Sequence, residues 1–204
     1  MIKIKKGLDL PISGTPLPVI TDTPTVNSVS LLSNDFIGMK PTMLVKTGDL
    51  VKVGTKIFED KKNPGVFFTS PAGGTISSIN RGDKRKFLSV EIDISADEEY
   101  INFNYENNES SLRNLLIESG LWNAFRTRPF NRTPSIDAMP DAVFINCCDT
   151  NPLSVDPYEI INSDHKNFEL ALDALKILFK SPLHLCYQNA NFNTANDGIN
   201  YHQF

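Results

Sequence analysis

The sequence is short of cysteine, of basic charge and of long apolar runs, and each shortage excludes a class of protein. Three cysteines occur in 204 residues, and because Cys147 and Cys148 are adjacent, they form neither a CxxC redox pair nor a zinc knuckle. A formal net charge of −4 argues against a nucleic-acid partner. No apolar run approaches the roughly 20 residues that cross a bilayer, and the N-terminus is too polar for a signal peptide. We therefore expect a cytoplasmic protein with free, buried thiols.

The remaining composition, with 40% hydrophobic and 22% charged residues, is typical of a folded chain. Residues 1–100 predict a β-rich domain, because Gly, Pro, Asp and Asn interrupt β-prone runs every 8–12 residues or less. We expect strands at residues 2–4, 26–32, 41–45, 50–53, 56–59, 66–69, 74–80 and 87–94.

From residue 101 onward the spacing of the apolar residues changes, and residues 101–204 are predicted to form a partial Rossmann-like α/β domain. Residues 95–108 are acidic and Asn-rich and are the best candidate for a linker. A helix begins near Ser110 or Ser111 and ends at Gly120. An apolar strand at 142–145, an amphipathic helix at 165–180 and a strand at 183–187 then form a βαβ unit. The last seventeen residues are polar and predict no element.

The first domain contains a repeated turn pattern with a specific fold signature. Gly48 and Gly54 supply positive-φ turns, while Val51 and Ile57 point inward. Ser70-Pro71 ends one strand and Gly74 opens the next. The pattern resembles the biotinyl-lipoyl family, which implies a barrel-sandwich hybrid. In that family a hairpin lysine carries biotin or lipoate, so Lys61 and Lys62 are carrier candidates. The loop is longer than the carrier pattern and lacks Met-Lys-Met, which favours a solvated turn.

Longer motifs carry a closer resemblance. They are Lys5-Lys6-Gly7-Leu8-Asp9-Leu10-Pro11-Ile12, Phe58-Glu59-Asp60-Lys61-Lys62-Asn63-Pro64-Gly65-Val66, Ile79-Asn80-Arg81-Gly82-x-Lys84-Arg85, Ser119-Gly120-Leu121-Trp122 with Arg126-Thr127-Arg128-Pro129-Phe130, and Asp149-Thr150-Asn151-Pro152-Leu153. In this order, up to about residue 180, they resemble the N-terminal part of the NqrA family, the NqrA component of the Na+-translocating NADH:quinone reductase. That family is itself similar to the RnfC component of the Rnf complex and to the flavoprotein subunit of complex I.

The resemblance implies an accessory subunit of an NADH:ubiquinone reductase that exports sodium, peripheral to the inner membrane on its cytoplasmic side. In the relatives a Gly-rich loop binds FMN phosphate through backbone N–H groups. Here only Gly120 remains of that loop, and Trp122 and Phe125 occupy the place where the phosphate would approach. The resemblance therefore implies a chain without flavin, iron–sulfur cluster or metal, with FMN, FAD and iron–sulfur groups in partner subunits. An FMN-binding flavoprotein subunit is the alternative.

Two apolar loops with cationic neighbours are candidates for a quinone contact, since a quinone needs apolar walls and a donor for its carbonyl oxygen. The candidate residues are Phe36, Ile37, Met39, Arg126, Arg128 and Phe130. The competing interpretation, which we favour, is an interface or an anchored loop whose arginines pair with carboxylates. The three histidines lack metal-ligand spacing. We expect no catalytic residue, and Asp149 or Asn151 most simply caps a turn.

Overall fold

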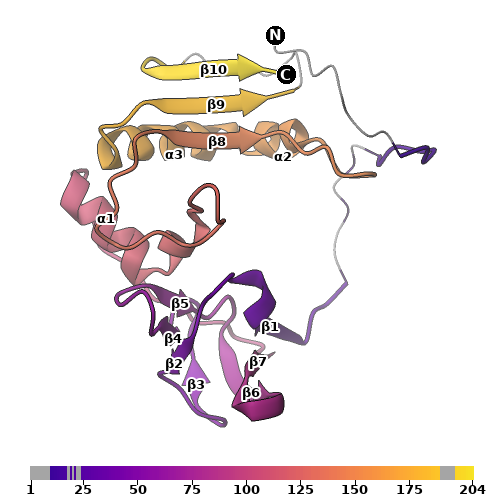
Figure 1. Ribbon diagram of the computed structural model, residues 1–204. Coiled ribbons are helices and arrows are strands. Elements are labelled where there is room, and N and C mark those ends of the chain that lie inside the picture. Colours follow the sequence, from indigo (N-terminus) through magenta and orange to yellow (C-terminus); the bar gives the residue numbers. More distant parts are fainter. Residues whose placement is uncertain (1–9, 18, 20, 22–23, 189–195) are drawn as a thin grey trace. The chain divides into compact units, whose positions relative to one another are not determined.

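The computed structural model describes residues 10–17, 19, 21, 24–188 and 196–204, and these form two compact units (Figure 1). The β unit comprises the described residues of Thr23–Glu106 and Ser110–Ala138. The α/β unit comprises those of Met1–Asp22, Asn107–Glu109 and Met139–Phe204. The strand expected at residues 2–4 lies outside the described part of the chain.

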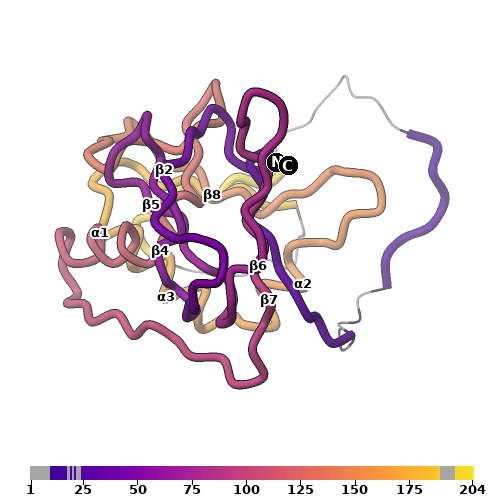
Figure 2. Tube along the Cα trace, turned by 90° about the horizontal axis from the view of Figure 1, so that it is seen from below, coloured from indigo at the N-terminus to yellow at the C-terminus, as the bar shows by residue number. Residues whose placement is uncertain are grey.

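The β unit is a curled pair of antiparallel sheets, as expected for a barrel-sandwich hybrid. One sheet has the order β1-β7-β6-β3 and the other β2-β4-β5, whose three strands run side by side in Figure 2. Their bounds are β1 Ser28–Leu32, β2 Pro41–Met43, β3 Leu50–Val51, β4 Lys56–Asp60, β5 Phe67–Thr69, β6 Gly74–Arg81 and β7 Phe87–Ile94. The inward residues of both sheets form one core, led by Ile57, Phe58, Phe68, Ile76, Val90 and Ile92, which are at most 1% exposed.

The predicted turn pattern of the β unit is confirmed. Gly48 and Gly54 have φ of +92° and +90°, a region that residues with a Cβ resist. Val51 on β3 and Ile57 on β4 are buried, as the pattern predicted. β5 ends just before Ser70, and β6 begins at Gly74.

The helix α1 (Glu109–Glu118) and the 3₁₀ turn Leu121–Ala124 pack against the β unit. Gly120 ends α1 in the left-handed region, at φ +78°. A Cβ placed there would lie 2.5 Å from Thr69 Oγ1, and that hydroxyl donates a 2.8 Å hydrogen bond to Ser119 O. Only a glycine allows the helix end to approach β5 so closely.

Residues 95–106, most of the segment considered as a linker from the sequence, belong to the β unit. Val53 N donates to Glu99 O at 2.8 Å, and Ile101 N donates to Val53 O at 2.9 Å. Phe103 lies against Gly54, with its ring 3.2 Å from the place of a Cβ. The segment is acidic and Asn-rich, but its apolar residues Ile101 and Phe103 pack on the glycine turn.

The α/β unit contains the predicted βαβ arrangement. Strands β8 (Val143–Cys147), β9 (Leu183–Tyr187) and β10 (Ile199–Gln203) form a parallel sheet in the order β10-β9-β8. Helices α2 (Pro157–Ser163) and α3 (His165–Leu178) follow one side of it (Figure 1). The sequence interpretation missed α2 and β10. Asp156 caps α2 by accepting from Tyr158 N at 2.9 Å, and β10 is short, with only Ile199 buried.

Candidate functional site

The loop of residues 33–40, between β1 and β2, presents apolar side chains over the core of the β unit. It begins with the 3₁₀ turn Ser33–Asp35. The Phe36 ring packs edge-on against Phe68, with 4.5 Å between centroids, and Phe68 in turn stacks on Phe58. Ile37 is 53% exposed. A rigid aromatic floor therefore supports an apolar side chain that faces solvent.

Arg126 fastens this loop to the segment that follows α1. Its guanidinium carbon lies 5.9 Å from the centre of the Phe36 ring, and its Nη2 is 3.5 Å from Asp35 O. Its Nη1 donates to Thr133 Oγ1 at 3.1 Å and to Asn123 O. The expectation that Arg126 pairs with a carboxylate is wrong among the described residues, because its acceptors are carbonyl and hydroxyl oxygens.

A cavity of about 480 Å³ is lined in part by the same loop, and this volume suits a small ligand. Phe36, Ile37 and Met39 line it together with five cationic residues. The lining residues are Ser33, Asn34, Phe36, Ile37, Gly38, Met39, Lys40, Pro41, Arg81, Lys84, Arg85, Lys86 and Phe87. The motif at residues 79–85 thus reaches the cavity, although no chemistry was assigned to it from the sequence.

Arg128 and Phe130 lie on a hairpin closed by pairing of Thr127 with Arg132. Thr127 N donates to Arg132 O at 2.8 Å. Phe130 is 71% exposed, and Arg128 is exposed as well. Neither residue lines the cavity. The structure thus gathers Phe36, Ile37, Met39 and Arg126 at one loop and leaves the other two candidates on a neighbouring hairpin tip.

The hairpin that contains Lys61 and Lys62 is fixed by its neighbours. Asn63 Nδ2 donates to Thr133 O at 3.2 Å and to Pro134 O at 2.9 Å. The buried Asp60 carboxylate accepts 3.0 Å bonds from the backbone N–H groups of Lys40 and Lys62. Lys62 Nζ itself donates to Gly38 O. These contacts give the Asn-Pro-Gly motif a structural role in positioning the loops beside the cavity.

The segment around Gly120 and Trp122, which the sequence resemblance placed at a flavin loop, is packed into the β unit. Trp122 is 1% exposed, and its Nε1 donates to Pro134 O at 3.1 Å. Arg113 lies over its ring at 5.2 Å, and the Phe125 ring meets it edge-on at 5.1 Å. Because Thr69 occupies the space in front of Gly120, a phosphate has no direct approach to that glycine.

The α/β unit holds the cysteines and histidines in ordinary structural settings. Burial is the main cause that raises the pKa of the Cys147 thiol to about 11, and it also raises the pKa of Cys148 and of Cys186. All three thiols are free, but only Cys147 is buried, so the expectation of buried thiols is wrong for Cys148 and Cys186, which are half-buried. His184 Nδ1 lies 2.9 Å from His202 Nε2 on the next strand. No cluster of three metal-ligating side chains occurs in the described ranges.

Asp149 closes the turn after β8, as one of the two turn-capping candidates. Its Oδ1 accepts from Asn151 N at 2.9 Å and from Asn151 Nδ2 at 2.7 Å. Its own carbonyl oxygen accepts from Ser154 Oγ at 3.2 Å. The Asp-Thr-Asn-Pro motif is accordingly a self-contained loop at the carboxyl end of a parallel strand.

Two family models together match almost the whole length of the chain. The NqrA N-terminal barrel-sandwich hybrid domain matches residues 2–95, and the NqrA second alpha/beta domain matches residues 107–204. The chain belongs to the NqrA family. The second match runs through β10 to the last residue, so the resemblance does not stop near residue 180 as expected. The exact domain boundary, placed after residue 100 from the sequence, stays a prediction.

Curated relatives agree with these models, and each is named as the NqrA-type component of a Na(+)-translocating NADH-quinone reductase. The chain is 46% identical to the protein of Actinobacillus pleuropneumoniae serotype 5b over 215 residues, covering 100% of this chain and 48% of the relative. It is also 46% identical to the protein of that name from Haemophilus influenzae strain Rd, with the same coverage. For Glaesserella parasuis the identity is 47%, over 91% of this chain and 43% of the relative. The chain spans about half the length of the curated relatives it matches.

No described helix is both long and apolar enough to cross a membrane.

Proposed function

We propose that this NqrA-family chain works as a cofactor-free part of a Na+-translocating NADH:quinone reductase. It supports electron transfer from NADH to ubiquinone coupled to sodium export, while FMN, FAD and iron–sulfur groups reside in partner subunits. It is peripheral to the inner membrane, on the cytoplasmic side. Its own contribution is a set of braced loops that dock the partner subunits.

The bracing of the loop of residues 33–40 carries this proposal. Arg126, Lys62 and the Asp60 carboxylate each fix a different part of it, and Asn63 fixes the adjacent hairpin. Surface loops ordinarily lose conformational entropy on binding, so a loop held in place beforehand binds a partner at lower cost. The packing of Trp122 and Thr69 around the former flavin loop supports the absence of FMN.

Co-purification tests the docking role. The tagged chain is expressed with its genomic neighbours, and we expect it to retain membrane-bound redox subunits. Replacement of Asn63 and Arg126 by alanine should weaken that retention, whereas Lys46→Gln, an exposed cation outside these loops, should leave it unchanged. Failure of the unmodified chain to retain any redox subunit would contradict the proposal.

The same preparation tests the two alternatives. An intact mass equal to the sequence mass excludes biotin or lipoate on Lys61 or Lys62. An absorption spectrum without flavin bands in the isolated chain is expected. A stoichiometric FMN spectrum would show instead that the segment around Trp122 binds the flavin.

A quinone contact is the second candidate function, and one observation favours it. Phe36, Ile37 and Met39 share the wall of a cavity, and Arg126 lies against Phe36. A photoreactive ubiquinone analogue should label residues 33–40. The double variant Ile37→Ser/Met39→Ser should lose the labelling, while Leu50→Ser, which removes an 82% exposed leucine outside the cavity, should keep it. Equal labelling of all variants would refute the quinone contact.

A further inference from the structure

The cavity beside residues 33–41 concentrates positive charge in a protein whose formal net charge is −4. Lys40, Arg81, Lys84, Arg85 and Lys86 line it, and no carboxylate does. Among the described residues none of these five side chains forms a salt bridge. The only side-chain hydrogen bond found for them there runs from Arg81 Nη1 to Arg85 O, at 3.3 Å. Cations that repel one another without a counter-charge are suited to an anionic ligand.

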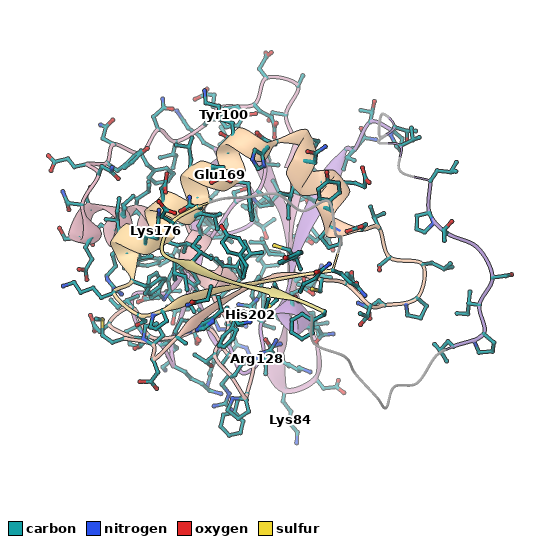
Figure 3. The ribbon with its side chains drawn as sticks, turned by 90° about the horizontal axis from the view of Figure 1, so that it is seen from above. Lys84, Tyr100, Arg128, Glu169, Lys176 and His202 are labelled. Carbon is teal, nitrogen blue, oxygen red and sulfur yellow. The ribbon has the colours of Figure 1, made fainter. Side chains whose placement is uncertain are left out.

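Two of these cations lie in the turn that joins β6 to β7. Lys84 and Arg85 have φ of +54° and +62° in succession, a left-handed conformation that favours glycine over residues with a Cβ. The turn is closed by hydrogen bonds from Gly82 N to Lys86 O at 2.8 Å and from Arg85 N to Gly82 O at 3.1 Å. Positive φ at both central residues is the geometry of a type I′ hairpin turn, and Lys86 N donates to Asp83 O at 3.1 Å across it, so this backbone places the two cations at the tip of the β6–β7 hairpin. In Figure 3 the Lys84 side chain extends away from the ribbon.

Apolar side chains line the cavity as well. Phe36, Ile37, Met39, Pro41 and Phe87 line it, and Phe87 is 6% exposed, so it belongs to the core as well. Arginine forks match phosphate oxygens in pairs, and clustered lysines add point charges that favour a dianion. A ligand that satisfies both groups of side chains carries a phosphate on an apolar body.

We propose that this cavity binds a small organic phosphate with an aromatic or aliphatic body. The phosphate lies among Arg81, Lys84, Arg85 and Lys86, and the body lies on Phe36, Ile37 and Met39. The site differs from the quinone contact in its chemistry, because a neutral quinone leaves the five cations without a counter-charge. The two proposals share these apolar residues, but they are tested with different probes, so either can fail without the other.

Calorimetric titration of the full chain tests this site with four probes: 1-naphthyl phosphate, 1-naphthol, inorganic phosphate and 1-naphthylamine. We expect saturable binding of naphthyl phosphate, at least tenfold weaker binding of inorganic phosphate, and none of the other two. Lys84→Gln/Arg85→Gln should weaken naphthyl phosphate binding at least tenfold and Ile37→Ser about threefold. The matched control Lys46→Gln, which removes an exposed cation outside the cavity, should stay within twofold.

Replacement of Lys84 and Arg85 by glycine separates the effect of their left-handed backbone on stability from the effect of their charge on binding. Lys84→Gly/Arg85→Gly should raise the melting temperature, since glycine adopts left-handed φ freely, and should abolish binding at the same time. A lower melting temperature would show that the two side chains are retained for folding and would overturn the proposal. So would the absence of saturable binding, equal affinity for naphthol, or an equal loss in Lys46→Gln.

Vesicles distinguish a soluble phosphate from a lipid headgroup. Co-sedimentation is measured with vesicles of phosphatidylglycerol and of phosphatidylcholine. We expect no co-sedimentation with either. If phosphatidylglycerol vesicles bound the chain through Lys84 and Arg85 while naphthyl phosphate did not, the cations would form a membrane contact, and the small-ligand site would be refuted.

Discussion

Gly120 is the residue whose replacement best tests how the β unit is assembled. Gly120→Ala forces a residue with a Cβ into φ of +78°, which costs roughly 1–2 kcal/mol. The new Cβ would lie 2.5 Å from Thr69 Oγ1 and 2.9 Å from Thr69 Cγ2. Thr69 must therefore turn away, and its hydrogen bond to Ser119 O is lost, at about 1 kcal/mol. The free energy of unfolding should fall by roughly 2–3 kcal/mol in total.

The single tryptophan makes this loss measurable in the β unit alone. Trp122 is buried there, so its fluorescence during urea or thermal unfolding reports that unit. We expect the melting temperature to fall by roughly 8–13 °C. Gly48→Ala is the matched control, because its φ is +92° but no atom lies within 4 Å of the new Cβ. It should lose only the conformational part, roughly 1–2 kcal/mol.

A double variant isolates the contact with Thr69. Thr69→Ala alone should cost about 1 kcal/mol through the lost hydrogen bond, but it should cost almost nothing further when combined with Gly120→Ala. If Gly120→Ala were no more damaging than Gly48→Ala, and if the two Thr69 effects were additive, the close approach of α1 to β5 would be refuted.

Two further predictions concern single side chains. Asn63→Ala removes both hydrogen bonds to the carbonyl oxygens of Thr133 and Pro134, so it should lower the free energy of unfolding measured in urea by roughly 1–3 kcal/mol. The control Lys61→Ala should change that free energy by less than about 0.5 kcal/mol. Equal effects of the two substitutions would contradict the docking of this hairpin. Burial is the main cause that raises the pKa of the Cys147 thiol from 9.0 to about 11. The folded state therefore holds this proton more tightly than the unfolded state. The stability that the buried thiol contributes is complete below about pH 9 and is lost as the pH rises through 11. Cys147→Val should flatten the alkaline fall of stability in that interval, and an unchanged slope would refute the assignment.

The elements of the chain were largely predictable because local patterns agree with the tertiary structure. All seven strands expected between residues 26 and 94 are present, since their turns depend on glycine conformation and their alternation on a single core. α1, α3 and β9 lie where apolar periodicity and a terminal glycine or proline placed them. β10 and α2 were missed, because their few buried residues give no clear period.

The candidate site was only partly predictable. The sequence pointed to an apolar loop with Phe36, Ile37 and Met39, and to Arg126 as a cation among aromatic residues. It did not show that Arg126 contacts this loop, because the two are about 90 residues apart in the sequence. No pattern in residues 79–86 shows that Lys84 and Arg85 share a cavity with that loop. The left-handed backbone of Lys84 and Arg85 has no sequence signature either, since neither residue is glycine.

The sequence by itself determined the two kinds of module and the family of the chain, because strand alternation, glycine turns and ordered motifs are local properties that hold in any context. Only the tertiary structure decided that α1 and residues 98–103 pack with the β unit. It also decided that Thr69 fills the space before Gly120 and that five cations meet an apolar wall. These outcomes depend on which distant surfaces become neighbours, and that is fixed by the packing of the whole core.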